Sequence, residues 1–422
     1  MIRIHEEKQL SGGLQDDEKW LSALLCALLL AGAVPFAQAE ESEYNEADMA
    51  KYAKCVNSLA VEYGVPAVLW DCSVHVNRKE LKVNYPAYVE AIMNCYPADR
   101  TPGNGGNNAV FEEETAWEAA ANFGPAANLG NTLDAHSYSH REDLAGNSGW
   151  IVKWGKKDAE GKVLTSAWET AWGQPVTTAE TADFVLAQGF TTIRIPVTWA
   201  KHIDENNQVD PRWMARVKEV VDLFYSRGVY VIINMHHDGG AEGWIKASEA
   251  SYSAYGPRYA AVWQQIAQTF ADYDERLLFE SVNEVLDEAN RWNAPSADAA
   301  KWMNAWNALF VETVRATGGN NARRNLLLMT YAGGNAEGNF STFVLPEEDP
   351  THLMITVHNY EPTGFTWTDA TWTRMTARWN ANTHGSTLRN YFQRYKKYAD
   401  LFGVPVVLGE YNATPKKYAD YD

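Results

Sequence analysis

The sequence alternates short apolar runs with longer amphipathic stretches over most of its length. After about residue 110, seven apolar runs rich in Val, Ile and Leu predict buried strands. These runs cover residues 126–129, 192–197, 229–234, 277–282, 326–331, 353–357 and 405–408. Helical stretches between them indicate parallel strands joined by crossover helices. A closed parallel barrel of this kind needs eight strands, because a missing strand would leave two unpaired edges.

The eighth strand is expected near the start of the chain. Residues 45–63 place apolar side chains on one helix face, and Gly64 and Pro66 are suited to ending that helix. A short strand at 67–70 and a second helix at about 88–93 follow. We therefore expect an α/β fold, a (β/α)8 barrel that this early segment completes.

The domain boundaries follow from this count of strands. Residues 40–96 supply the completing helix, strand and helix, residues 97–109 form a linker rich in Pro, Gly and Asn, and residues 110–422 supply the other seven strands. The whole of 40–422 would then be one domain. The alternative is a small α-β-α module before an incomplete barrel, but a lone strand would leave its backbone hydrogen bonds unpaired.

Two of the predicted strands deliver a glutamate at or just beyond their carboxyl ends, Glu284 and Glu410. A lone glutamate after a strand is more often a solvated loop residue. A pair of carboxyl groups on either side of a glycosidic bond is nevertheless what its hydrolysis requires, one as proton donor and one as nucleophile or base.

Other polar and aromatic residues follow the ends of further predicted strands. In a barrel of parallel strands these ends converge on one face, where the active site is built. The candidates for substrate-binding or supporting roles are Trp70, Asn131, Arg194, His236, His237, Asn283, His358 and Tyr360.

Together these motifs resemble glycoside hydrolase family 5, the cellulase family, and most closely its subfamily 4. Further matches are Asn-Leu-Gly-Asn-Thr-Leu-Asp-Ala at 128–135 and Glu-Thr-Ala-Trp-Gly at 169–173. The resemblance covers nearly everything after about residue 43. Two departures concern fine substrate geometry: Tyr411-Asn412 stands where the family often has an aromatic residue and Gly, and Cys72-Ser73 where Asn-Gly is common.

The resemblance implies a circularly permuted order, in which helix 7, strand 8 and helix 8 of the family's barrel come first. It also implies a retaining endo-acting enzyme that cleaves β-1,4-glucan, with xyloglucan, mixed-linkage glucan and xylan as further candidate substrates. Glu410 would be the nucleophile and Glu284 the acid/base. The alternatives are a β-mannanase on the same fold and a non-catalytic polysaccharide-binding barrel.

The resemblance also assigns the supporting residues. Arg194 would keep Glu410 ionised, and Asn283 would contact the 2-hydroxyl of the sugar. His358 and Tyr360 would position the carboxylates, and Trp70 would stack under the sugar on the non-reducing side.

Composition bounds the partners and the compartment. The net charge of -18 argues against binding nucleic acid. An apolar run at 21–36 ends in Ala37-Gln38-Ala39, which has the form of a signal-peptidase site. Residues 1–39 are therefore interpreted as a signal peptide with an atypical acidic extension, and the mature chain as a monomer that is secreted, periplasmic or at the cell surface. An uncleaved anchor and a later translation start are the alternatives.

No motif indicates a metal or another cofactor. His236 and His237 would point to opposite faces if both lay on a strand, which would make them poor co-ligands. Three cysteines remain after residue 39, Cys55, Cys72 and Cys95. A Cys55–Cys95 disulfide is one interpretation, and three buried thiols is the favoured one.

The 17 tryptophans exceed what a core alone requires. Flat aromatic rings bind the apolar faces of sugars, so tryptophans in connecting segments predict a long cleft suited to internal cleavage of a polymer. The candidates are Trp150, Trp154, Trp168, Trp172, Trp244, Trp292, Trp367 and Trp372, whereas Trp302 and Trp306 are expected in helix packing.

Overall fold

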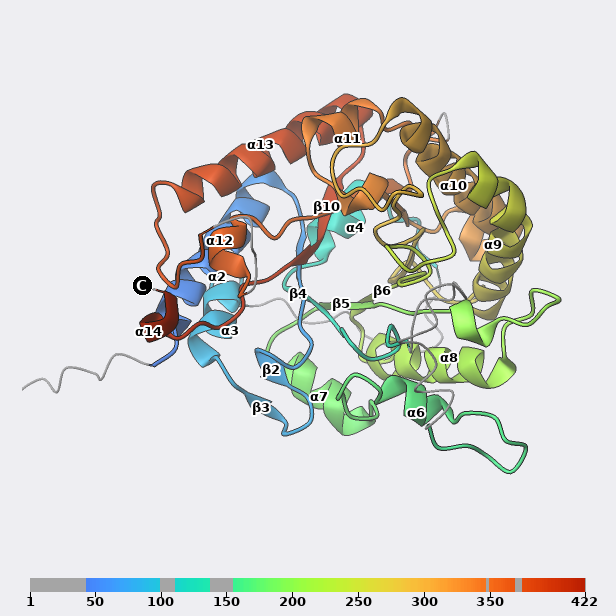
Figure 1. Ribbon diagram of the computed structural model, residues 1–422, viewed down its shortest axis with the longest axis horizontal. Coiled ribbons are helices and arrows are strands. Elements are labelled where there is room, and N and C mark those ends of the chain that lie inside the picture. The colour runs from blue at the N-terminus through green and yellow to red at the C-terminus, as the bar shows by residue number, and fades with distance from the viewer. Residues whose placement is uncertain (1–42, 99–110, 137–154, 347–348, 369–373, 422) are drawn as a thin grey trace, which may run out of the picture. The chain divides into compact units, whose positions relative to one another are not determined.

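The computed structural model describes residues 43–98, 111–136, 155–346, 349–368 and 374–421 (Figure 1). Eight parallel strands close into a barrel in the order β1-β10-β9-β8-β7-β6-β5-β4, which confirms the predicted (β/α)8 fold. The strands are β1 (Ala67–Leu69), β4 (Ala126–Asn128), β5 (Thr192–Ile195), β6 (Tyr230–Asn234), β7 (Leu277–Glu280), β8 (Leu326–Met329), β9 (Leu353–His358) and β10 (Val406–Tyr411).

The early strand β1 closes the barrel. It lies between β10, the last barrel strand in the chain, and β4, the second. Ala67 pairs in parallel with Leu408 of β10, and Val68 pairs in parallel with Ala126 of β4. These pairings confirm the prediction that the early segment completes the barrel. The alternative of a separate α-β-α module is wrong, because β1 has a hydrogen-bonded neighbour on each side.

Helices follow most strands, and the long ones surround the barrel (Figure 1). The helices of the described residues are α2 (Glu46–Tyr63), α3 (Pro86–Met93), α4 (Ala116–Asn122), α6 (Thr165–Glu169), α7 (Ala179–Ala187), α8 (Pro211–Tyr225), α9 (Glu249–Thr269), α10 (Ala297–Ala316), α11 (Glu337–Ser341), α12 (Thr363–Thr366), α13 (His384–Phe402) and α14 (Tyr418–Tyr421). Short 3-10 turns lie at Ala200–His202, Gly319–Ala322 and Tyr331–Gly333, and β2 (Val76–Asn77) pairs with β3 (Lys82–Val83) in a hairpin.

The helix boundaries follow local sequence signals. At the start of α4, the Thr115 side chain accepts a hydrogen bond from the Glu118 backbone N–H, and the Glu118 carboxylate accepts one from the Thr115 backbone N–H. At the start of α8, Asp210 caps the helix and Pro211 takes the first position, where no backbone donor is needed. Gly64 ends α2 in the left-handed conformation that glycine adopts without steric cost.

The barrel interior has two layers, and strand periodicity explains both. Inward-facing apolar side chains fill the lower layer together with Phe123 from the end of α4. The strand members of this cluster are Val68, Ala126, Ile232, Leu278, Leu327, Met354 and Val407. Because side chains alternate along a strand, the residue two positions later points into the same interior. These later residues include Asn128, Asn234 and Glu280, so the upper layer is polar.

The described ends of the chain lie side by side, as the blue and red elements of Figure 1 show. The backbone N–H of Asn45 donates to the Lys416 carbonyl at 2.8 Å, and the Lys416 N–H donates to Asn45 Oδ1 at 2.8 Å. The Tyr418 hydroxyl adds a bond to Asp48 Oδ2 at 2.7 Å. The segment after β10 is therefore tied to the start of α2 without a covalent link.

Further sequence predictions concern the membrane, the cysteines, the signal peptide and the linker. Within the described part of the chain, none of the helices is both long and apolar enough to cross a bilayer. Cys55, Cys72 and Cys95 are all free and partly buried, so the alternative of a Cys55–Cys95 disulfide is wrong. The expected signal peptide at 1–39 lies outside the described residues, as does nearly all of the expected linker at 97–109.

Candidate active site

A cavity of about 910 Å³ opens at the carboxyl ends of the strands. Most of the predicted site residues line it, together with two of the tryptophans predicted for a substrate cleft. The lining includes Trp70, His236, His237, Asn283, Glu284, Trp292, His358, Tyr360, Trp367 and Glu410. The structure thus brings together residues that are up to 340 positions apart in the sequence (Trp70 to Glu410).

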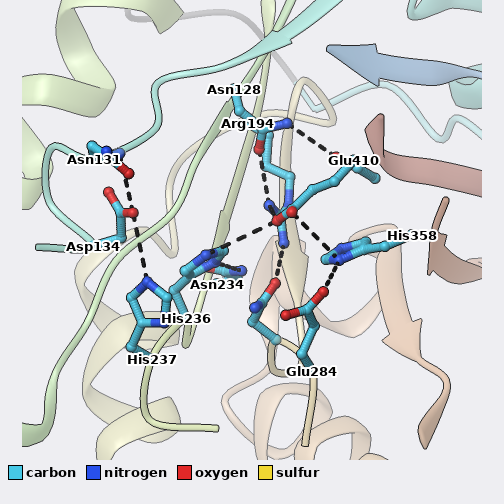
Figure 2. Close-up of polar contacts among 12 residues, drawn as sticks. Asn128, Asn131, Asp134, Arg194, Asn234, His236, His237, Glu284, His358 and Glu410 are labelled. Carbon is cyan, nitrogen blue, oxygen red and sulfur yellow. Dashed lines mark hydrogen bonds and ion pairs between the residues drawn. The ribbon is translucent and has the colours of Figure 1, made fainter. Parts of the chain in front are cut away.

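Glu284 and Glu410 face each other across this cavity, with His358 between them (Figure 2). His358 Nδ1 lies 2.8 Å from Glu284 Oε1 and 3.5 Å from Glu410 Oε2. A carboxylate oxygen of each glutamate lies within 4.8 Å of the other. The two groups are therefore close enough to act on the same bond.

The two glutamates differ in exposure. The side chain of Glu284 is 23 % exposed and that of Glu410 only 6 %. Burial raises the pKa of Glu410 above its ordinary value, while the charges of His358 and Arg194 oppose the rise. The pKa of His358 is itself raised, because Glu410 and Glu284 outweigh the effect of its burial.

Arg194, fully buried beneath the cavity, makes hydrogen bonds through all three of its nitrogens and ion pairs with two carboxylates. Its Nε and Nη2 reach Glu280 Oε2 at 2.8 and 2.6 Å, and Nη2 also donates to Asn283 Oδ1 at 2.9 Å. Nη1 donates to Asn128 Oδ1 and to Glu410 Oε1, both at 2.8 Å. The guanidinium therefore holds one oxygen of Glu410 in place and also positions Asn283.

The other oxygen of Glu410 accepts a hydrogen bond from the Tyr360 hydroxyl at 2.7 Å. Burial, reinforced by Glu410 and Glu284, raises the pKa of Tyr360 well above its ordinary value. Tyr360 therefore remains a neutral donor, and Glu410 is held at both oxygens.

Hydrogen bonding decides the tautomer of His236. Asn234 Oδ1 accepts from the Val197 backbone N–H, so its Nδ2 faces His236 Nδ1 at 3.2 Å as a donor. The ring must then carry its proton on Nε2, which lies 4.0 Å from Glu410 Oε1. Burial lowers the pKa of His236 well below its ordinary value, so the ring is neutral.

The strand-alternation argument against His236 and His237 as co-ligands does not apply. Strand β6 ends at Asn234, so both histidines lie in the loop and approach Asp134, with one ligand atom of each within 4.8 Å of the others. His236 Nδ1 is nevertheless engaged by Asn234, and the resulting tautomer leaves no free nitrogen lone pair on that ring. This donor set therefore does not fit a metal ion without breaking the Asn234 bond.

Loop geometry places Glu284 itself. Its backbone φ is +38°, in the left-handed region that non-glycine residues rarely adopt. A Cβ added at Gly333 would lie 3.2 Å from Glu284 Cγ and 3.3 Å from the His358 ring. Glycine at 333 therefore leaves room for both side chains.

The aromatic residues divide into cavity and core positions. The Trp70 ring stacks on His236 with centroids 5.6 Å apart and an interplanar angle of 6°. Trp292, 58 % exposed, and Trp367 lie elsewhere on the cavity wall. The expectation that Trp168 and Trp244 line a cleft is wrong, because both are buried in the core. Trp150, Trp154 and Trp372 lie outside the described residues.

One predicted residue lies apart, and several important ones were not predicted. Asn131 does not line the cavity; its backbone N–H donates to Asp134 Oδ2 at 3.1 Å (Figure 2). No sequence motif indicated a catalytic or supporting role for Glu280, Asn234 or Asn128. A charged residue inside the apolar run 277–280 was the available signal for Glu280, because a buried charge requires a partner.

Such a site, with two carboxylates at strand ends of a (β/α)8 barrel and aromatic rings around them, is typical of glycoside hydrolases. The family model for cellulase (glycosyl hydrolase family 5) matches residues 157–421. The chain therefore belongs to glycosyl hydrolase family 5.

Curated relatives support this membership. Endoglucanase A of Clostridium longisporum is 35% identical over 309 residues, which are 72% of this chain and 54% of that protein. Endoglucanase A of Ruminococcus albus is 34% identical over 318 residues, 74% of this chain and 76% of that protein. The chain thus spans about half the length of the first relative and three quarters of the second.

Solved structures are similar as well. A family 5 enzyme from Prevotella bryantii in complex with a xyloglucan tetradecasaccharide has a TM-score of 0.61 and 37% identity, covering 72% of this chain and 80% of that chain. A GH5-4 broad-specificity endoglucanase from Ruminococcus champanellensis with bound cellotriose has a TM-score of 0.64 and 32% identity, covering 74% and 84%.

Proposed function

We propose that this chain is a retaining endo-β-1,4-glucanase with Glu410 as nucleophile and Glu284 as acid/base. The observation that carries the proposal is the proximity of the two carboxylates: one oxygen of each lies within 4.8 Å of the other, and His358 Nδ1 lies 2.8 Å from Glu284 and 3.5 Å from Glu410. Retaining enzymes keep their carboxyl groups about 5 to 5.5 Å apart, whereas inverting enzymes leave about 6.5 to 9.5 Å for a water molecule.

In the first step, Glu410 attacks the anomeric carbon and forms a carbon–oxygen bond. The glycosidic bond breaks, and its electron pair stays on the leaving oxygen, which takes a proton from Glu284. Arg194 and Tyr360 hold the two oxygens of Glu410 for this attack. His358 contacts both carboxylates and can follow the change of charge between them.

In the second step, a water molecule loses a proton to Glu284 and releases the sugar from Glu410. Two inversions at the anomeric carbon give net retention. Asn283, held by Arg194, is proposed to contact the 2-hydroxyl of the sugar. Trp70, stacked on His236, is proposed to support the sugar on the non-reducing side, and His237 lines the same part of the cavity.

The endo mode and the glucan preference rest on the cavity and on the relatives. The cavity has an exposed tryptophan on its wall, Trp292, and a volume larger than one sugar unit needs. Relatives named endoglucanases favour glucan over mannan. Xyloglucan belongs among the candidate substrates because a similar enzyme was solved in complex with it.

The proposal includes the order of the chain, its compartment and its state of assembly. Strand β1 takes the place of the family's eighth strand, so the domain 40–422 is a circular permutant of the family's barrel. A polymeric substrate favours an enzyme that acts outside the cytoplasm, in keeping with a signal peptide at 1–39. We propose a monomer that needs neither a metal nor another cofactor.

The stereochemistry of the first product tests the reaction. We expect proton NMR during hydrolysis of a cello-oligosaccharide to show the β-anomer first, with the α-anomer appearing only through mutarotation. An α-anomer that appears first would overturn the nucleophile assignment. Reducing-sugar release and viscosity on carboxymethylcellulose, lichenan, xyloglucan, xylan and mannan test the substrate, and a rapid fall in viscosity on a glucan is the expected result.

A further inference from the structure

Glu280 occupies an unusual position below the catalytic carboxylates. It is the last residue of β7, and its side chain is completely buried in the polar upper layer of the barrel. Its Oε2 accepts hydrogen bonds from Arg194 and from Asn234 Nδ2, the latter at 2.8 Å. Its Oε1 is buried with no hydrogen-bond partner within the described residues. A side chain chosen only for stability would not leave a buried carboxylate oxygen without a partner.

The charges around Arg194 show what this carboxylate can do. Arg194 is a single cation between two buried carboxylates, Glu280 and Glu410. Two of its nitrogens, Nε and Nη2, lie against Glu280, and only Nη1 contacts Glu410. Without a charge on Glu280, the whole positive charge would act on the Glu410 carboxylate and make it a weaker nucleophile.

The other groups facing Glu410 cannot replace this function. His236, which follows β6, is neutral and 4.0 Å away. His358 and Tyr360, from β9 and the loop after it, donate to Glu410 or to Glu284 and carry no compensating negative charge. Glu284 itself loses and regains a proton in the proposed reaction, so its charge changes. Glu280 is thus the one negative charge near Arg194, among the described residues, that the reaction leaves unchanged.

We propose that Glu280 is a positioning residue that sets the nucleophilicity of Glu410 through Arg194. Its negative charge balances the guanidinium, and its two contacts fix the guanidinium so that a single N–H reaches Glu410. This inference rests on the proposed function, because it assumes that Glu410 attacks the sugar.

The test uses the full chain and 2,4-dinitrophenyl β-cellobioside, whose leaving group needs no proton from Glu284. The measurement is the pH profile of kcat/KM. On this substrate its acid limb, where kcat/KM falls as the pH is lowered, reports the ionisation of Glu410. In Glu280→Gln the shape is kept and the charge is lost, so the Glu410 pKa falls. We expect the acid limb to move down by about one pH unit. We also expect the plateau to fall on the order of tenfold, because a less basic carboxylate is a weaker nucleophile.

Glu280→Asp is the matched control, because it keeps the charge and shortens the side chain. A purely structural role predicts that both variants lose activity and thermal stability while the acid limb stays in place. The proposal predicts an acid limb near that of the wild type in Glu280→Asp and a lower one in Glu280→Gln. An unchanged limb in folded Glu280→Gln would overturn it.

Asn128→Asp gives a second test with the opposite sign, should Glu280→Gln fail to fold. Asn128 Oδ1 contacts the same Arg194 Nη1 that reaches Glu410, so an added negative charge there should raise the acid limb. A limb that stays in place or falls in folded Asn128→Asp would contradict the proposal. Failure of the wild type to cleave the cellobioside would instead count against the proposed function, so the two failures are distinguishable.

Discussion

The Nδ1 atom of His358 lies 2.8 Å from the Oε1 atom of Glu284, so a hydrogen bond joins the imidazole and the carboxyl group. The same nitrogen lies 3.5 Å from the nucleophile candidate Glu410. In the proposed reaction, negative charge leaves Glu410 during the attack and appears on Glu284 as that residue gives up its proton. His358 Nδ1 lies within reach of both carboxylates and could stabilise the charge in either state of that reaction.

Azide should separate the roles of the two glutamates. Both Glu410→Ala and Glu284→Ala are expected to lose at least about 1000-fold in kcat, because each removes a group from the reacting centre. On an activated β-cellobioside, azide should give an α-cellobiosyl azide with Glu410→Ala and a β-cellobiosyl azide with Glu284→Ala. NMR of the isolated azides distinguishes them. Glu312→Ala, on the exposed face of α10, is the control and should behave as wild type.

Trp70 should contribute to sugar binding rather than to the chemistry of the bond. Its ring lies flat on His236 and lines the cavity beside Glu410. Trp70→Ala should weaken cellotriose binding to the inactive Glu284→Gln variant by about 1 to 2 kcal/mol, measured by calorimetry. Trp302→Ala removes a ring from α10 outside the cavity lining and should leave this affinity unchanged. Equal affinities in the two variants would contradict the placement of Trp70 under the sugar.

His202 should make the fold sensitive to acid. Its ring stacks on Trp213 with centroids 3.8 Å apart, and burial lowers its pKa to about 3. Below the ordinary histidine pKa of about 6.5, the unfolded chain binds a proton at His202 that the folded chain does not bind. The free energy of unfolding therefore falls as the pH falls.

The measurement is urea unfolding between pH 7 and pH 4. His202→Phe keeps a ring on Trp213 and removes the titration, so the loss of stability per pH unit should become smaller by up to about 1.4 kcal/mol. His236 and His237 are also buried with lowered pKa values, so part of the slope should remain. An unchanged slope in His202→Phe would show that this ring does not titrate as inferred.

The segment that carries β1 should be indispensable to folding. A chain that begins at Ala109 lacks the strand between β10 and β4, and its barrel interior would open to water. We expect it to be insoluble or unfolded by circular dichroism. Co-expression with a separate fragment covering residues 40–98 should restore solubility and activity. A soluble, active chain from Ala109 alone would refute the assignment of β1 to the barrel.

Activity should not depend on a metal ion. The proposed reaction uses carboxylates, and the Asn234 bond to His236 removes a ligand from the histidine pair. Dialysis against EDTA should leave kcat/KM within about twofold of its starting value, since no Lewis acid is needed for two-carboxylate hydrolysis. Loss of activity that one divalent ion restores would contradict this prediction and would point to one of two possible ligand groups, Asp134 with His236 and His237 or Glu284 with His358 and Glu410.

The amino-acid sequence by itself determined the class of fold and the pair of carboxylates. Apolar runs separated by amphipathic helices require a parallel barrel, and a count of seven after residue 110 requires the strand near Trp70. Glu284 and Glu410 could be found because strand ends of such a barrel converge on one face. Strand ends were less certain: β10 continues through Glu410 to Tyr411, and β7 ends at Glu280 instead of Val282.

Only the tertiary structure decided how the polar layer is connected. Which N–H of Arg194 reaches Glu280, Asn128 or Glu410 depends on the register of β4, β5, β7 and β10, and no local pattern contains that register. The loop path after β6 likewise turned His236 and His237 toward Asp134, contrary to strand alternation. Sequence periodicity indicates which face of a helix or strand is buried. The partner of a buried charged side chain is determined by long-range hydrogen bonds, because burial removes water and leaves the charge dependent on residues distant in the chain.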